Sequence, residues 1–120
     1  MIESDVRTYL LADPDVAALI GARIYPMPLP QEATLPAVTY QRVFGAEGID
    51  HQGPSGLGRA RLQFDAWAKT YGEAVAVSEE VRKALRVYPG TRIVNVMDLP
   101  EPEVALRRRM VEVSTWYQEA

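Results

Sequence analysis

The sequence predicts an α+β fold in which an antiparallel or mixed four-stranded sheet packs against two to three helices in the order α(α)ββαββ. Apolar and polar residues alternate strictly over residues 59–69, as in a strand with one buried face. Apolar residues recur at spacings of three and four over 74–88, as on the inner face of a helix. The chain has 120 residues, of which 48% are hydrophobic and 24% charged, so we expect one domain over 1–120.

The first part of the chain predicts helix. Residues 3–12 place apolar side chains on one face, with Ser4 as the N-cap. A second helical start follows, in which Asp13 is the cap, Pro14 occupies the first helical position and Gly21 ends the periodic stretch. Two short helices, or one helix broken at Pro14, fit the pattern equally well.

A proline-rich segment and a first strand come next. Residues 24–36 contain four prolines in thirteen residues, which indicates an extended, stiff connection rather than a regular element. Residues 37–44 are β-branched and aromatic and are bounded by Pro36 and Gly45, so they predict a strand.

A glycine-rich connection leads into the alternating strand. Residues 45–58 hold five of the eight glycines. In the strand that follows, we expect one set of side chains to face the helices and the other to form a polar face. The first set is Ala60, Leu62, Phe64, Ala66 and Ala68, and the second is Arg59, Arg61, Gln63, Asp65 and Trp67.

A capped helix and two further strands complete the prediction. Thr70 and Glu73 are spaced as a capping box, and the helix they start places Val77, Val81 and Leu85 on its inner face. Residues 91–99 predict a third strand and 104–117 a fourth. No single two-residue alternation places the apolar residues of the last strand on one face. Val111 and Val113 point one way, while Leu106, Met110 and Trp116 point the other. A bulge near Arg108 or Arg109 would shift the alternation and explain the mixture.

Composition excludes several classes of protein. The net charge is −3 and the pI about 5.1, so no overall basic field attracts nucleic acid. The absence of cysteine removes disulfides, thiolate nucleophiles and sulfur-ligated zinc. The first residues lack a positive region and no apolar run approaches a membrane span, so we expect a soluble, intracellular domain without a signal peptide.

The glycine-rich connection does not predict a phosphate site. "GPSGLGR", residues 53–59, lacks the lysine and hydroxyl of a Walker loop and precedes a strand rather than a helix. We therefore interpret it as a long hairpin connection in which glycine supplies conformational freedom.

No other cluster predicts chemistry. His51 is the only histidine and has no evident partner. The carboxylates of Asp98, Glu101 and Glu103 lie in a proline-stiffened turn without calcium-binding spacing. The arginines 107–109, together with Arg59 and Arg61, could form a solvated face, a protein contact or a nucleic-acid contact. We predict no catalytic, cofactor-binding or metal-binding residue.

Several stretches together resemble the phage tail completion, or tail-terminator, family of siphophage-like tails, prophages and gene transfer agents. They are "LLADPDVAALIGARIYP" (10–26), "LPAVTYQRV" (35–43), "GPSGLGRARLQFDAWAKTYGEA" (53–74), "VRKAL" (81–85) and the arginine-rich last strand ending in "STWY" (114–117). The most specific is R-x-Q-x-D-x-W-A-x-T-Y-x-E-A over residues 61–74.

The resemblance implies a structural virion protein without catalytic residues or cofactors. Members of the family form a ring, usually a hexamer, at the head-proximal end of the tail tube, where they stop tube growth and join tail to head. The implied partners are other copies, the tail tube protein and a head-closure or neck protein. The implied place is the head–tail junction of the virion, after assembly in the host cytoplasm, with no membrane contact and no specific nucleic-acid binding.

Two alternatives remain open. One is another component of the head–tail neck, such as a head-closure or stopper protein, and the other is a small nucleotide-binding or enzyme domain. If the chain is a tail terminator, we expect the glycine-rich arm and the polar strand face beside it to contact a neighbouring subunit or the tube. The residues assigned to that contact are Gly53, Ser55, Gly56, Leu57, Arg59, Arg61, Gln63 and Asp65.

Overall fold

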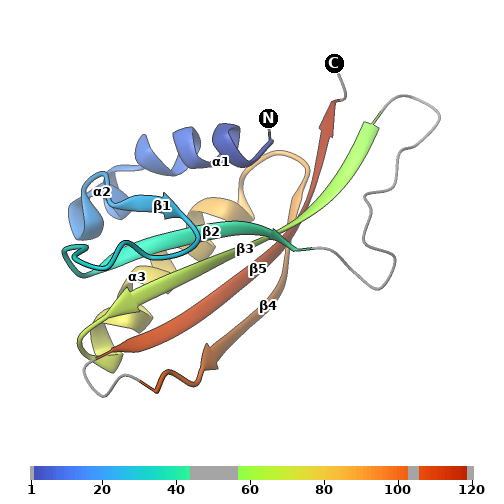
Figure 1. Ribbon diagram of the computed structural model, residues 1–120. Coiled ribbons are helices and arrows are strands. Elements are labelled where there is room, and N and C mark those ends of the chain that lie inside the picture. Colours follow the sequence, from blue (N-terminus) through green and yellow to red (C-terminus); the bar gives the residue numbers. More distant parts are fainter. Residues whose placement is uncertain (1, 44–56, 103–105, 119–120) are drawn as a thin grey trace.

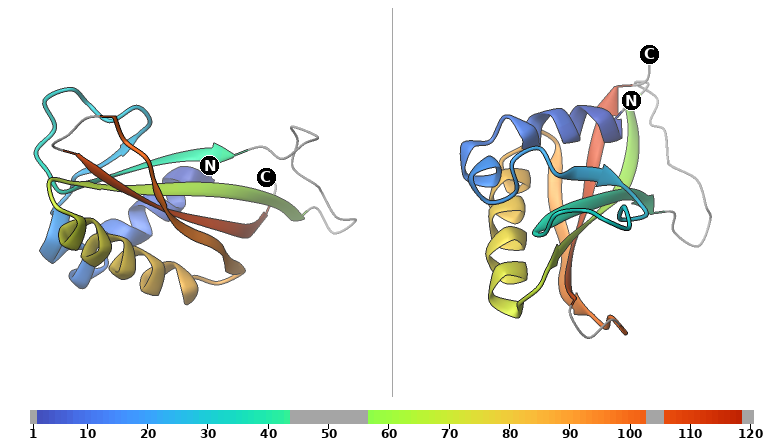
Figure 2. Two further views of the ribbon diagram at one scale, coloured as in Figure 1. Left: turned by 90° about the horizontal axis from the view of Figure 1, so that it is seen from below. Right: turned by 60° about the vertical axis from the view of Figure 1, so that its left-hand side comes forward.

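The computed structural model describes residues 2–43, 57–102 and 106–118, which form three helices and five strands (Figure 1). The strands make one sheet in the order β1-β2-β3-β5-β4. The pairing of β1 with β2 is parallel and the other pairings are antiparallel. All three helices lie on one side of the sheet (Figure 2). The predicted α+β class is confirmed, with one strand more than the four expected.

Two separate helices begin the chain. Helix α1 (Ile2–Leu11) starts before Ser4, so the prediction that Ser4 caps it is wrong. Ile2 is buried on the same face as Val6 and Leu10, and that burial extends the helix to its first residues.

Helix α2 (Pro14–Ile20) follows the predicted signals. Asp13 Oδ1 accepts hydrogen bonds from the backbone N–H groups of Asp15 and Val16, at 2.9 and 3.0 Å. Gly21 ends the helix with a φ of 59°, in the region that favours glycine.

The proline-rich segment contains a strand that the sequence did not predict. Strand β1 (Ile24–Pro26) pairs in parallel with β2 (Ala37–Val43), in the register Ile24↔Val38 to Pro26↔Tyr40. The expectation of a connection without regular structure is therefore wrong for these three residues. Pro26 is tolerated because β1 is an edge strand, where one row of backbone groups has no neighbour to bond.

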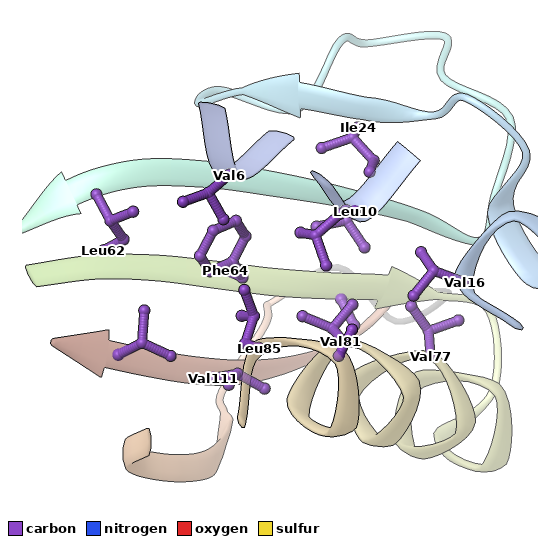
Figure 3. Packing of buried hydrophobic residues seen from close by; sticks show 14 of the residues in the cluster. Val6, Leu10, Val16, Ile24, Leu62, Phe64, Val77, Val81, Leu85 and Val111 are labelled. Atoms are coloured by element: carbon purple, nitrogen blue, oxygen red, sulfur yellow. The ribbon is translucent and has the colours of Figure 1, made fainter. Parts of the chain in front are cut away.

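The core lies between the sheet and the helices. Strand β3 (Leu57–Ala68) is central, and helix α3 (Tyr71–Arg86) crosses behind it after the predicted cap at Thr70. Figure 3 shows side chains from β3, β5 and α3 meeting those of α1 and α2. All five predicted core residues are buried, which confirms both the helix face and the strand face: Leu62, Phe64, Val77, Val81 and Leu85.

The last strand is regular, which corrects the predicted bulge. Strand β5 (Arg107–Gln118) pairs with β3 residue for residue, from Ala68↔Arg107 to Leu57↔Gln118. Both of its faces carry apolar residues because Met110 is buried on the face opposite Val111. The mixed parity therefore reflects two covered faces rather than an extra residue.

The irregularity lies instead in the edge strand β4 (Thr91–Leu99). Ile93 pairs with Val113 and Asn95 with Glu112, so Val94 is an extra residue without a partner of its own. This bulge switches the side-chain parity of β4 halfway along its length.

Truncation of Phe64 tests the assigned strand face. Phe64 is 1% exposed, and Phe64→Ala should lower the free energy of unfolding by about 3–5 kcal/mol, through lost burial and a new cavity. Denaturant unfolding measures this change. Val87→Ala, at a residue 69% exposed, is the control and should stay within about 0.5 kcal/mol. A cost for Phe64→Ala below about 1 kcal/mol would contradict the assigned core.

Candidate functional site

The face of the sheet that the helices leave uncovered, here called the open face, carries four of the eight predicted contact residues. Side chains alternate along each strand, so the register assigns them to one side or the other. The predicted orientation of Arg59, Arg61, Gln63 and Asp65 away from the helices is confirmed. The register assigns to the open face Tyr25, Ala37, Thr39, Gln41, Val43, Arg59, Arg61, Gln63, Asp65, Trp67, Arg92, Asn95, Met97, Leu99, Arg108, Met110, Glu112, Ser114 and Trp116.

A buried carboxylate lies at the centre of the open face. Asp65 is 0% exposed, and its Oδ2 accepts a hydrogen bond from an Arg108 terminal nitrogen at 2.9 Å. The Gln63 side-chain amide donates to both carboxylate oxygens, at 3.0 and 3.1 Å. These contacts compensate the loss of hydration, because a charge that is buried without partners strongly destabilises the folded state.

Trp67 extends this cluster to a third strand. The Arg108 guanidinium lies over the Trp67 ring, 4.7 Å from the ring centre, and the Trp67 indole N–H donates to Thr39 Oγ1 at 2.8 Å. The group of Thr39, Gln63, Asp65, Trp67 and Arg108, here called the Asp65 network, thereby ties β2, β3 and β5 together.

Arg61 and the neighbours of Arg108 in the run 107–109 also have partners. Arg61 pairs with Glu112 at 3.1 Å on the open face. Arg109, on the helix side, pairs with Asp98 at 2.9 Å, and Asp98 also accepts from the Tyr71 hydroxyl. Arg107 donates to the backbone carbonyl of Leu106. The run of arginines at 107–109 is thus divided between two faces and largely neutralised, which makes it a poor electrostatic surface for nucleic acid.

Within the residues that the structure describes, one end of the sheet narrows to two strands. Strand β2 ends at the pair Val43↔Arg61, and β4 begins at Thr91↔Thr115. Residues 57–59 of β3 and 116–118 of β5 pair with each other beyond these points, and Figure 1 shows both strand ends extending past their neighbours. This two-stranded end is here called the tip.

The tip carries an exposed aromatic residue. Trp116 is 46% exposed, and the Arg59 guanidinium lies 5.5 Å from its ring centre. Arg59 is held there by a 2.7 Å hydrogen bond to Ser114 Oγ. Arg59 belongs to the contact surface expected from the sequence, whereas Trp116 was not among the residues expected there.

Some predicted residues lie outside the described part of the chain. They are Gly53, Ser55 and Gly56 of the proposed contact, together with His51 and Glu103. Leu57 is the first residue of β3. The assignment of Gly53, Ser55, Gly56 and Leu57 to a contact surface stays a prediction.

Two side chains, one on α3 and one just after it, have pKa values shifted by their surroundings. The hydrogen bond from Arg82 lowers the pKa of Glu79 on the helix surface. Burial raises the pKa of Tyr88, whose ring packs against Tyr9 at 4.6 Å between ring centres. A helix-surface ion pair and a packed aromatic ring explain these shifts without invoking proton-transfer chemistry.

The described residues show neither a metal-binding cluster nor a membrane-spanning helix. Over residues 2–43, 57–102 and 106–118, no group of three His, Cys, Asp or Glu side chains is placed to hold a metal ion. Within the same ranges, no helix is long and apolar enough to cross a membrane.

Comparison with protein families gives a match over almost the whole chain. The model of the family "Tail completion protein gp17" matches residues 4–118. The chain belongs to this tail completion family. It is therefore a structural protein of a phage-type tail, and the resemblance drawn from the sequence is confirmed.

Comparison with solved structures gives the same fold. A chain from the virion of a native gene transfer agent particle is 19% identical, with a TM-score of 0.65, over 92% of this chain and 90% of that chain. No curated protein sequence matches the chain.

The geometry explains the most specific stretch of the tail completion resemblance, residues 61–74. Gln63, Asp65 and Trp67 belong to the Asp65 network, while Thr70 and Glu73 cap α3 through a 3.2 Å hydrogen bond from the Glu73 N–H to Thr70 Oγ1. These residues position the strand and the helix. The partners Thr39 and Arg108 were missed because only the register brings them to Asp65 and Trp67.

Removal of the Asp65 carboxylate tests the network. Asp65→Ala should lower the free energy of unfolding by about 3 kcal/mol or more, because it leaves a mostly buried guanidinium without a counter-charge. The control Glu80→Ala breaks the pair with Lys83, which is 60% exposed, and should cost about 0.5 kcal/mol or less. Chemical denaturation measures both.

A double variant separates the ion pair from simple packing. Asp65→Leu combined with Arg108→Leu should be more stable than Asp65→Leu alone, since no unpaired charge remains. Equal loss in the single and double variants would show that the charge interaction does not hold the strands in register.

Proposed function

We propose that this tail completion protein closes the head-proximal end of the tail tube as a ring, ends tube growth and joins the tail to the head. The observation that carries the proposal is the family match over residues 4–118. A fold shared with a chain of a gene transfer agent virion supports it. The partners in this proposal are other copies of the chain, the tail tube protein and a neck protein of the capsid.

The arrangement of the surface is compatible with a role in assembly. Helices cover one side of the sheet, while the centre of the open face is occupied by side chains that bond to one another. Contact with partners would then fall to the margins of the open face. The proposed contact region is the glycine-rich arm with Gly53, Ser55, Gly56 and Leu57, and the neighbouring Arg59 and Arg61. Gln63 and the fully buried Asp65 belong to the central network and would support the contact by holding the strands in place.

Loss of the protein tests the function directly. In cells that assemble these tails without it, we expect tubes of excess and variable length that are not attached to heads, because nothing ends their polymerisation. Electron microscopy measures the length distribution and the attached fraction. Tails of normal length that fail to attach would instead indicate another neck component. Normal, attached tails would contradict the proposal.

The arm is tested in the same assay. Shortening residues 47–56 to an Asn-Gly turn should leave the monomer folded, because β2 and β3 remain joined by a turn suited to a hairpin. Such a variant should fail to terminate tubes. If it terminates tubes at the normal length, the arm is only a connection.

The absence of enzymatic activity is part of the proposal and has its own test. Millimolar ATP, GTP or NAD with Mg²⁺ should leave the melting temperature unchanged. A ligand at 100 times its dissociation constant would stabilise the fold by about 2.7 kcal/mol, which a thermal scan detects. A clear upward shift would support a nucleotide-binding domain instead.

A further inference from the structure

A hollow lies at the sheet edge where the short strand β1 ends. Strand β1 stops at Pro26, opposite Tyr40, whereas β2 continues to Val43. The place that a longer β1 would fill is open, and the N-terminal turn of α1 passes beside it. The resulting hollow has a volume of about 390 Å³.

The lining of the hollow combines apolar surface with an ion pair. Pro26, Met27 and Tyr40 contribute apolar and aromatic surface. Glu3 and Arg42 also line it and pair with each other at 2.8 Å. A carboxylate can accept several hydrogen bonds, so Glu3 has the capacity to bind a second cation beside Arg42.

The tip of the sheet has the complementary properties. Its two strands have no further strand beside them in the described part of the chain, although the Trp116 N–H donates to the Gly90 carbonyl at 3.0 Å. A two-stranded ribbon gains stability from further contacts. It also presents Trp116, 46% exposed, with Arg59 fixed against its ring. Tryptophan and arginine are the residues most enriched at the energetic centres of protein interfaces.

We propose that the tip of one copy docks into the hollow of a second copy, with Trp116 against Pro26, Met27 and Tyr40. An indole ring fits an apolar hollow of this size and makes favourable contacts with a thioether and with a tyrosine ring. Arg59 accompanies Trp116 and brings a guanidinium to Glu3, which supplies charge complementarity. This inference rests on the proposed assembly into a ring and names the surfaces that would form it.

The two surfaces also have the geometry that a ring requires. The tip and the hollow are different parts of the chain, so their contact is heterologous and each copy has one of each. Successive contacts of this kind close into a ring when the rotation between copies permits it. A contact of the tip with itself would instead stop at a dimer.

Site-specific photo-crosslinking tests the contact. Trp116 is replaced by p-benzoylphenylalanine, which keeps an aromatic ring at this position, and the crosslinked peptides are identified by mass spectrometry. The experiment is run on assembled tails and on the purified protein at high concentration. The expected product joins residue 116 to a peptide of another copy that contains Glu3 or Pro26–Met27. The control carries the same photoprobe at Tyr71, which is 53% exposed at the opposite end of the sheet, and should not label these peptides.

Matched substitutions test the hollow from its other side. Ser4→Trp fills the hollow from its rim, since Ser4 is exposed on α1 and lines it. Ala18→Trp, on the exposed side of α2 and outside the lining of the hollow, is the control. Ser4→Trp should reduce the crosslinked fraction at least tenfold, and Ser4→Trp and Trp116→Ala should each reduce the assembled fraction at least tenfold, with melting temperatures close to that of the unchanged protein. Ala18→Trp should retain assembly.

The outcomes distinguish this contact from the proposed function. Crosslinks from residue 116 to the tube protein, to a neck protein or to another surface of the chain would overturn the docking. So would the absence of crosslinks between copies in tails that stop at the normal length, while termination itself would stand. If tail length does not depend on the protein, termination fails, and the crosslinks in the purified protein alone decide whether the tip binds the hollow.

Discussion

A carboxylate without solvent exposure at the centre of a sheet requires a cation in a fixed position, and Asp65 meets that requirement through Arg108 on the neighbouring strand. A slip of one residue between β3 and β5 would turn Arg108 to the helix side and leave Asp65 buried without a counter-charge. Such an uncompensated charge costs several kcal/mol. The pair therefore selects one register between β3 and β5, and that register also places Trp116 opposite Arg59.

Local patterns predicted the elements whose signals are contained in their own residues. Alternation along β3 gave both of its faces, and the capping residue with helical spacing gave α3 and its buried side. Strand β1 was missed because three residues in a proline-rich segment show no periodicity, and their pairing with β2 is a tertiary contact. The bulge predicted in β5 assumed that apolar residues mark a single buried face. In the structure Met110 and Val111 are buried on opposite faces, so no bulge is needed there.

The candidate site shows the same division between local and non-local information. The orientation of Arg59, Arg61, Gln63 and Asp65 followed from alternation alone. The partners of these side chains could not be predicted from alternation. Arg108 and Thr39 lie 43 and 26 residues away from Asp65 along the chain, and only the pairing of the strands brings them to β3. The family resemblance supplied a role in the tail. The structure adds that the most specific residues of that resemblance stabilise the fold, while the exposed Trp116 lies at the margin.

The extra residue at Val94 has a consequence for the behaviour of the free protein. An edge strand of nine residues offers its unpaired backbone groups to any other strand, and sheets can grow without limit by such additions. A bulge interrupts the regular spacing of these groups and twists the edge, so an incoming strand cannot pair along its full length. The bulge thereby disfavours aggregation of the free protein through the β4 edge.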